Sequence, residues 1–265
     1  MSASNQRLVE SRRFVRFISD KFPGGAYGIL TGETIPSLDA APWLGGKAAG
    51  GEVLLSSAKL LAPVEPSKIV CVGLNYHAHV QASFSAENAP EYPLVFLKPP
   101  SAIIGPDDGI VHPPQSERVD YEAELGVVIG KKATKVTLED AEKYIFGYTC
   151  VNDVTARDLQ KKDGQWSRAK GFDTFCPVGP WIVTELNFRD VLVEGIHNGE
   201  IKQSGRTSQM IFDIPFLVSY ISSVMTLYPG DLISTGTPSG IAPMKPGDSI
   251  EVRVEGIGSL INKMV

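Results

Sequence analysis

Two glutamates separated by one residue, Glu122 and Glu124, form the pattern in this chain that most directly indicates chemistry. They lie in an apolar segment that reads as a strand, where side chains two positions apart point to the same face. Neighbouring carboxylates repel, and each raises the pKa of the other unless a proton or a cation intervenes. Asp153, just past another apolar run, supplies a third acid. We therefore expect Glu122, Glu124 and Asp153 to bind one divalent cation.

The predicted ligands are all carboxylate oxygens, with no histidine or cysteine clustered beside them. Such a hard, oxygen-rich set favours Mg²⁺ or Mn²⁺, and Ca²⁺ also accepts these donors. Three protein ligands leave coordination positions open for a substrate. This arrangement suits catalysis better than a purely structural metal site.

Strands are the main elements expected to position these acids. Short apolar runs bounded by glycine and proline predict strands at 68–73, 94–97, 123–129, 147–151, 181–183, 192–196, 232–234 and 249–254. Pro-Gly-Asp turns at 229–231 and 246–248 each precede a strand. Helices are predicted over 137–146, capped by Thr137, and after Asp213, where apolar residues recur at helical spacing. The pattern indicates a β-rich α+β fold.

The first 66 residues differ in composition from the rest of the chain. They are rich in glycine and alanine and contain only short apolar pieces, and Pro63 and Pro66 then punctuate the sequence. We predict a small N-terminal β-rich domain over 1–66 and a larger domain over 67–265.

Composition limits the partners and the compartment. The net charge of −5 argues against nucleic acid as the main partner, because phosphate binding needs a clustered positive field. No apolar run approaches the roughly 20 residues of a membrane span, so no membrane partner is expected. The three cysteines are far apart and odd in number, which does not suggest a disulfide framework. A cytoplasmic location is the expectation.

Six motifs occur in an order that resembles the fumarylacetoacetate hydrolase family. They are 73–76 (GLNY), 96–101 (FLKPPS), 120–125 (DYEAEL), 152–158 (NDVTARD), 169–173 (AKGFD) and 235–240 (TGTPSG). The resemblance covers about residues 66 to 265. It implies a mixed β-roll around a Mg²⁺ or Mn²⁺ site, usually in a homodimer, acting on small 2-oxo and 1,3-dicarbonyl acids.

The same resemblance assigns roles to individual residues. It implies metal ligands at Glu122, Glu124 and Asp153, catalytic residues at Lys170 and His79, and substrate contacts at Gln160, Gly236 and Thr237. Lys170 would stabilise charge or move a proton, and a depressed pKa is expected for a lysine near a metal. Arg157 and Lys98 are expected to brace the site through ion pairs.

The reaction depends on His79, which the family's hydrolytic members pair with a glutamate three positions later to activate water. Here that position is Ala82, and Glu87 is the candidate replacement. The resemblance favours hydrolysis of a C–C bond, with oxaloacetate decarboxylation, or isomerisation or tautomerisation of an oxo acid, as alternatives. A non-catalytic metal-binding protein is a further alternative, but such a protein has no reason to retain both Lys170 and Asp153.

Overall fold

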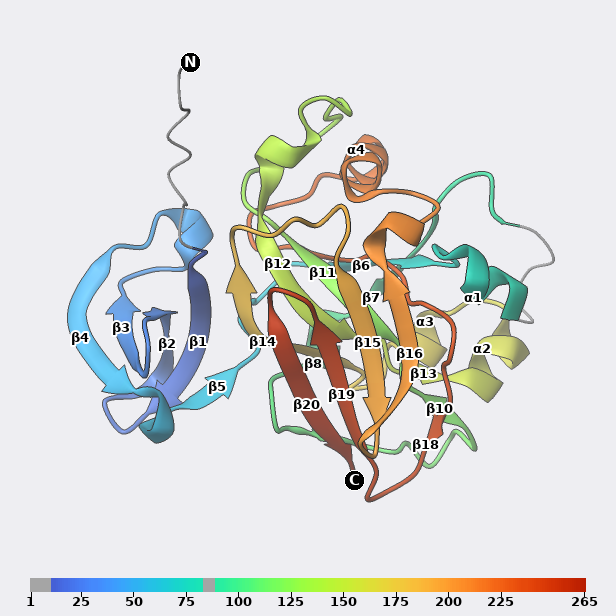
Figure 1. Ribbon diagram of the computed structural model, residues 1–265, viewed down its shortest axis with the longest axis horizontal. Helices are drawn as coiled ribbons and strands as arrows, with labels where there is room; N and C mark the ends of the chain where they lie inside the picture. Colours follow the sequence, from blue (N-terminus) through green and yellow to red (C-terminus); the bar gives the residue numbers. More distant parts are fainter. Residues whose placement is uncertain (1–10, 83–88) are drawn as a thin grey trace, which may run out of the picture.

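The computed structural model describes residues 11–82 and 89–265, and strands make up most of its regular structure. A small strand-rich N-terminal unit lies beside a larger body (Figure 1). The predicted β-rich α+β class is therefore confirmed. Glu87 lies outside the described residues, so the suggestion that it replaces a carboxylate at position 82 stays a prediction.

One large sheet runs through both parts in the order β4-β3-β2-β1-β14-β12-β11-β17-β6-β7, with β5 paired to β1 and β8 to β14. Its strands are β1 (Arg13–Ser19), β2 (Phe22–Leu30), β3 (Thr34–Leu38), β4 (Ala48–Leu54), β5 (Lys59–Leu61), β6 (Ile69–Gly73), β7 (Leu94–Lys98), β8 (Ile103–Ile104), β11 (Ala123–Ile129), β12 (Ile145–Asn152), β14 (Cys176–Val183) and β17 (Leu232–Ser234). Every residue of β11 is buried, as its uninterrupted apolar run predicts. This central strand carries Glu124 into the interior.

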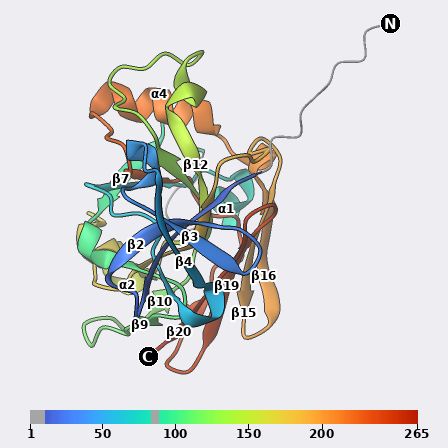
Figure 2. The same cartoon turned by 90° about the vertical axis from the view of Figure 1, so that its left-hand side faces the viewer.

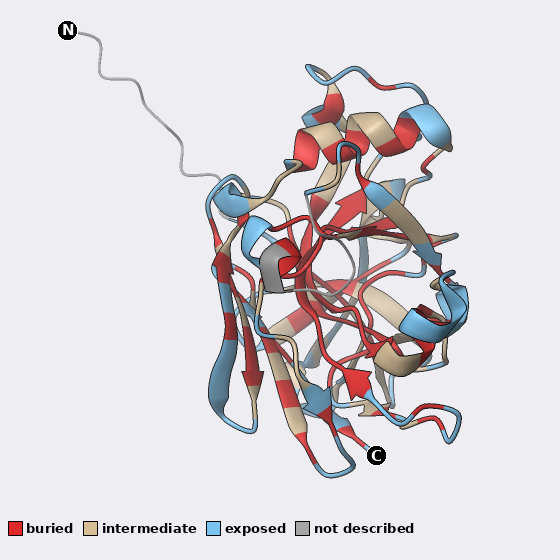
Figure 3. Ribbon diagram, turned by 90° about the vertical axis from the view of Figure 1, so that its right-hand side faces the viewer, coloured by how far each residue is buried: buried red, intermediate tan, exposed pale blue. Residues whose placement is uncertain are grey.

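A second, five-stranded sheet has the order β16-β15-β19-β20-β9. Its strands are β9 (Gly109–Ile110), β15 (Leu192–His197), β16 (Glu200–Arg206), β19 (Ser249–Val254) and β20 (Gly258–Met264). Val193 and Val252 of this sheet share a core with Leu125 and Val127 of β11. Figure 3 shows buried residues concentrated along the strands where the layers meet. A three-stranded sheet joins β10 (Val119–Asp120), β13 (Thr155–Ala156) and β18 (Pro243–Met244).

The N-terminal unit faces the viewer in Figure 2, where β1 to β4 cross in front of the larger body. Val15, Phe17 and Ile35 form its own apolar cluster. It is nevertheless continuous with the main sheet, because Arg13 pairs with Val183 in the antiparallel β1–β14 ladder. The position of the domain boundary near residue 66 stays a prediction.

Helix α4 (Ile214–Val224) confirms the helix predicted after Asp213. The Asp213 carboxylate accepts the N–H of Phe216 at 2.9 Å, a side-chain N-cap. Leu217 and Ile221 bury the apolar stripe. Within the described residues, three further short helices that the sequence did not predict are α1 (His77–Ala82), α2 (Arg157–Asp163) and α3 (Ser167–Lys170). None of the helices in the described ranges is long and apolar enough to cross a bilayer.

The predicted helix over 137–146 is wrong. The segment contains only a 3₁₀ turn, Ala141–Tyr144, and β12 already begins at Ile145. Ile145 pairs with Ile129 of β11, so the apolar end of the segment extends the sheet instead of a helix. Tertiary pairing overrides the local capping pattern here.

Candidate metal centre and active site

Two antiparallel neighbours, β11 and β12, bring the three predicted metal ligands together. Glu122 directly precedes β11, Glu124 lies within it, and Asp153 directly follows β12. The Asp153 N–H donates to the Glu122 carbonyl at 2.9 Å, which closes the end of the ladder. One carboxylate oxygen from each of the three residues lies within 4.8 Å of the others, and all three side chains are buried. The juxtaposition expected from the sequence is therefore present.

Three cations surround these acids. Lys170 Nζ lies 3.0 Å from Glu122 and 2.5 Å from Asp153. Lys98 Nζ lies 2.6 Å from the other Asp153 oxygen. Arg157 contacts Glu122 at 2.5 Å and reaches Asp120 at 2.9 Å. The ion pairs expected of Lys98 and Arg157 are confirmed.

The acids differ in their electrostatic environment. Burial, reinforced by the charges of Asp153 and Glu122, raises the pKa of Glu124 to about 8. Although burial opposes it, the charges of Lys170 and Arg157 hold the pKa of Glu122 below its ordinary value. Glu124 is therefore the acid whose ionised form gains most from an added cation.

Without a bound cation, Lys170 has a raised pKa, so the depressed pKa expected beside a metal stays a prediction for the metal-bound site. Burial lowers the pKa of the Lys170 ammonium, but Asp153 and Glu122 outweigh burial and raise it above its ordinary value. The family resemblance predicted a lysine near the metal ligands. It did not predict that the carboxylates of Glu122 and Asp153 would contact this lysine directly.

The donor set fits a hard divalent cation. The Oε2 atom of Glu124 accepts hydrogen bonds from Ser234 Oγ at 2.5 Å and from Gly236 N at 2.8 Å. These two donors fix the carboxylate while its Oε1 atom has no hydrogen-bond donor among the described residues. Oxygen donors fixed in this way are the ligands that Mg²⁺ and Mn²⁺ prefer.

One narrow pocket collects most of the predicted site residues. Its lining includes His79, Glu122, Glu124, Gln160, Lys170 and Thr237 together with Arg157 and Trp166. His79 projects from α1 and is buried, and burial lowers the pKa of its imidazole. Gln160 on α2 accepts a hydrogen bond from Arg157 at 2.7 Å.

Gly236, a predicted substrate contact, is not among the residues that line this pocket. Its N–H donates to Glu124, so this donor orients a predicted metal ligand. Its φ of 101° lies in the left-handed region, and an added Cβ would lie 2.7 Å from the Cβ of Asn75. The predicted contact between Gly236 and substrate stays a prediction.

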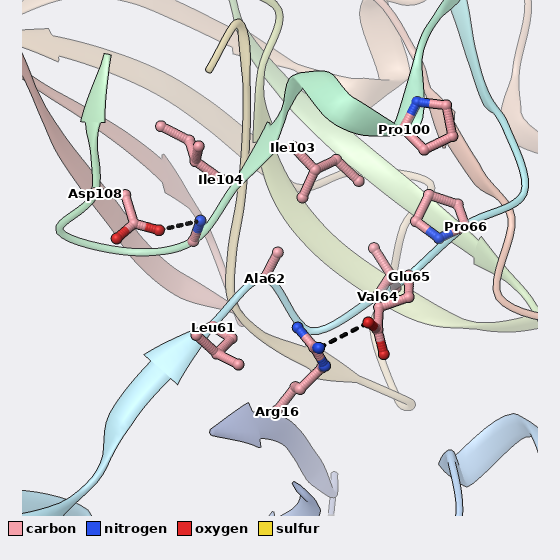
Figure 4. A pocket seen from close by; sticks show the side chains of 11 residues that line it. Arg16, Leu61, Ala62, Val64, Glu65, Pro66, Pro100, Ile103, Ile104 and Asp108 are labelled. Carbon is pink, nitrogen blue, oxygen red and sulfur yellow. Dashed lines mark hydrogen bonds and ion pairs between the residues drawn. The ribbon is translucent and has the colours of Figure 1, made fainter. Parts of the chain in front are cut away.

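A wider cleft of about 390 Å³ lies away from this centre, where the N-terminal unit meets the larger body (Figure 4). Arg16 on its rim pairs with Glu65 at 2.7 Å, and Asp108 accepts the N–H of Gly105 at 2.9 Å. Asp108 also pairs with Lys59 at 2.7 Å, so each charged group of the cleft already has a partner. None of the acids of the candidate metal centre lines this cleft.

Three residues that support the site were not predicted. Ser234 donates to the Glu124 carboxylate, and Asn75 holds the start of the 235–240 loop by donating to the Thr235 carbonyl at 2.8 Å. Gln203, from the second sheet, donates to Thr237 at 2.7 Å. Hydrogen bonds between residues so far apart in sequence leave no local pattern to detect.

Comparison with known proteins identifies similar chains along almost the whole length. Residues 68–265 match the family described as fumarylacetoacetate (FAA) hydrolase C-terminal, and residues 12–63 match the Rv2993c-like, N-terminal family. Oxaloacetate tautomerase YisK of Bacillus subtilis is 44% identical over 223 residues, covering 79% of this chain and 74% of the relative.

Solved structures agree with this sequence similarity. A 2-hydroxyhepta-2,4-diene-1,7-dioate isomerase from Mycobacterium marinum superposes with a TM-score of 0.89 at 44% identity, covering 96% of this chain and 98% of the other. A maleylpyruvate hydrolase from Sphingobium sp. SYK-6, solved with manganese(II) and pyruvate, superposes with a TM-score of 0.77 at 30% identity, with the same two coverages.

Proposed function

Because this chain belongs to the fumarylacetoacetate hydrolase family, we propose that it is a divalent-metal-dependent enzyme that interconverts the enol and keto forms of a small 2-oxo dicarboxylic acid. Oxaloacetate is the expected substrate, given the similarity to a tautomerase of that acid. The observation that carries the proposal is the position of Lys170, whose ammonium group touches two predicted metal ligands and lines the same pocket.

The charge of the site supports an acidic substrate. Four buried carboxylates and four cations form one connected set: Asp120, Glu122, Glu124, Asp153, Lys98, Arg118, Arg157 and Lys170. With all eight ionised, the charges of this set of described residues cancel, so a bound divalent cation would leave an excess of two positive charges. A dicarboxylate neutralises this excess, whereas a neutral carbonyl compound does not.

Glu122, Glu124 and Asp153 would hold the cation. When bound, it would supply positive charge and open coordination positions for the carboxylate and 2-oxygen of the substrate. Ketonisation transfers one proton from the 2-hydroxyl to C3, breaks no C–C bond and consumes no water. Lys170 is the group of this chain placed to move that proton or to stabilise charge developing on the 2-oxygen.

A proton transfer of this kind does not require the water-activating pair that position 82 lacks. His79 lines the same pocket as Lys170, so it is placed to orient the substrate or to assist the transfer. Departure from the hydrolytic pattern at Ala82 therefore agrees with tautomerisation.

Hydrolysis of a C–C bond is the second candidate, and His79 is the observation that favours it. Burial lowers the pKa of its imidazole, so the ring is neutral at neutral pH and suited to act as a general base. The similarity to a maleylpyruvate hydrolase points the same way. Oxaloacetate decarboxylation needs the same metal and lysine and is the third candidate reaction.

One assay separates these reactions. Enol-oxaloacetate is added to protein loaded with Mg²⁺ or Mn²⁺, enol absorbance is followed, and products are identified by mass. The proposal expects faster loss of the enol with oxaloacetate as the sole product. Pyruvate as the product would establish decarboxylation, and cleavage of an acylpyruvate without any effect on the enol would establish hydrolysis. A homodimer stays a prediction, which sedimentation equilibrium tests.

A further inference from the structure

A buried glutamine from the second sheet connects the metal-ligand strand to the loop over the pocket. Gln203 lies on β16 and has no exposed surface. Its Oε1 accepts the N–H of Ala123 at 2.9 Å, and its Nε2 donates to Thr237 Oγ1 and to the Pro238 carbonyl, both at 2.7 Å. Ala123 stands between the two ligand glutamates. Gln203 therefore fixes the backbone between the two glutamates.

The fold makes room for this side chain. A Cβ at Gly195 would lie 2.7 Å from Gln203 Oε1, and a Cβ at Gly205 would lie 2.7 Å from the Pro238 ring. These separations are too short for a side chain, so glycine at both positions allows the amide and the loop to approach closely.

The hydrogen-bond partners fix which atom donates in every bond of this network. The Ala123 N–H can only donate, so the Gln203 atom facing it must be the carbonyl oxygen. The amide nitrogen must then face Thr237, and Thr237 must accept from it. Thr237 Oγ1 also lies 2.8 Å from the Ala123 carbonyl, which can only accept. The single hydroxyl hydrogen of Thr237 is thus committed to Ala123.

What remains on Thr237 is one lone pair. A hydroxyl has one hydrogen and two acceptor sites, and Gln203 occupies one of these sites. Thr237 lines the pocket and directly follows Gly236, whose N–H holds the ligand carboxylate of Glu124. A ligand group that meets the Thr237 oxygen must therefore bring its own hydrogen, as an enol hydroxyl does and a ketone or carboxylate oxygen does not.

We propose that Gln203 is a positioning residue that fixes the Thr237 hydroxyl as an acceptor, so that the site recognises the 2-hydroxyl of the enol form of its substrate. This inference rests on the proposed function, because it assigns the 2-hydroxyl acid as the species that Thr237 contacts. It also refines the predicted role of Thr237, from a general substrate contact to a contact that selects a donor.

The test measures equilibrium binding, which does not depend on turnover. Pyruvate and lactate share a carbon skeleton and differ at C2, which carries a planar 2-oxo group in pyruvate and a tetrahedral 2-hydroxyl group in lactate. Each is titrated calorimetrically into the Mg²⁺-loaded chain. The quantity compared between variants is the ratio of the two dissociation constants, so that differences in ligand shape cancel. Thr237→Val should weaken lactate about tenfold relative to pyruvate, since one hydrogen bond is lost. Thr237→Ser should restore the wild-type ratio.

Gln203→Met retains the length of the side chain but removes the amide that donates to the Thr237 oxygen. Without that donor the hydroxyl is no longer held in one orientation, and its hydrogen can turn away from the Ala123 carbonyl. The Gln203→Met variant should shift the ratio of the lactate and pyruvate dissociation constants in the same direction as Thr237→Val. The control is Gln209→Met, at an exposed glutamine on the following turn, which should leave the ratio unchanged. If Thr237→Val does not fold, Thr237→Ala provides the same comparison. An unchanged ratio in the Thr237 or Gln203 variants would overturn the inference. If the variants show these shifts but the wild-type chain does not convert enol-oxaloacetate, the proposed function alone is refuted.

Discussion

The ammonium nitrogen of Lys170 lies 2.5 Å from a carboxylate oxygen of Asp153, at the centre of the buried acid cluster. The contact links α3 to the end of β12, two elements that adjoin the pocket from different parts of the chain. It places the candidate proton-transfer group against a candidate metal ligand. A cation and a proton carrier at this separation would act on the same end of one small substrate.

Lys170→Met tests that arrangement. We expect turnover to fall by roughly 100-fold or more, as for loss of a general acid or base, while affinity for Mg²⁺ is kept or increased because a competing positive charge is removed. Kinetic assays and calorimetric titration with Mg²⁺ measure the two effects. Lys161→Met, at an exposed lysine of α2, is the matched control. Wild-type turnover in Lys170→Met would exclude Lys170 from the chemistry.

Trp166 is expected to limit the length of the substrate. Its ring packs against Phe96 at 5.1 Å between centroids, and a Cβ at Gly73 would lie 2.7 Å from it. Trp166→Leu should raise kcat/KM for a longer 2-hydroxy dienedioate about tenfold relative to enol-oxaloacetate, since a pocket discriminates methylenes by about this factor. Gly73→Ala, which pushes the ring into the pocket, should shift the ratio the other way. Equal effects on both substrates would show that the ring is only structural.

The pH profile tests the role of His79. Its pKa is lowered by burial, so the neutral imidazole persists below the usual titration range of histidine, near pH 6.5. A rate that needs the neutral form should stay level from about pH 6.5 upward and decline only at lower pH. Measured with an acylpyruvate and with enol-oxaloacetate, His79→Gln should abolish hydrolysis but reduce ketonisation much less. Equal loss of both activities would contradict separate mechanisms.

Much of the fold and of the acidic cluster at the candidate metal centre could be predicted because the signals are local. The Glu-x-Glu spacing, the apolar run of β11 and the capped stripe of α4 all lie within short segments. The helix over 137–146 failed because pairing of Ile145 with Ile129 is a long-range effect. Strand β16 was not predicted because it is exposed along much of its length and contains no apolar run. The role of Gln203, which lies in this strand, was therefore not predicted either.

Asp231 shows how far long-range hydrogen bonds support the fold. Its buried carboxylate accepts from Ser67 Oγ at 2.7 Å and from Tyr228 N at 2.8 Å, and it pairs with Lys68 at 2.5 Å. Asp231→Ala leaves these donors without an acceptor and should lower the free energy of unfolding by about 3 kcal/mol. Urea denaturation measures the change. Unaltered stability would contradict this structural role, and Mg²⁺ affinity of the folded variant should match that of the wild type.

The most direct test of the proposed metal centre is the affinity for Mn²⁺ of variants at its three acids. Calorimetry and the electron paramagnetic resonance signal of the free ion both measure this affinity. The wild-type chain should bind one Mn²⁺, and Glu122→Gln, Glu124→Gln and Asp153→Asn should each weaken binding by roughly 100-fold or more, since losing a ligand costs at least as much as losing its outer support. Glu139→Gln, at an exposed site, is the control. Binding that all three variants retain would contradict the proposed metal centre.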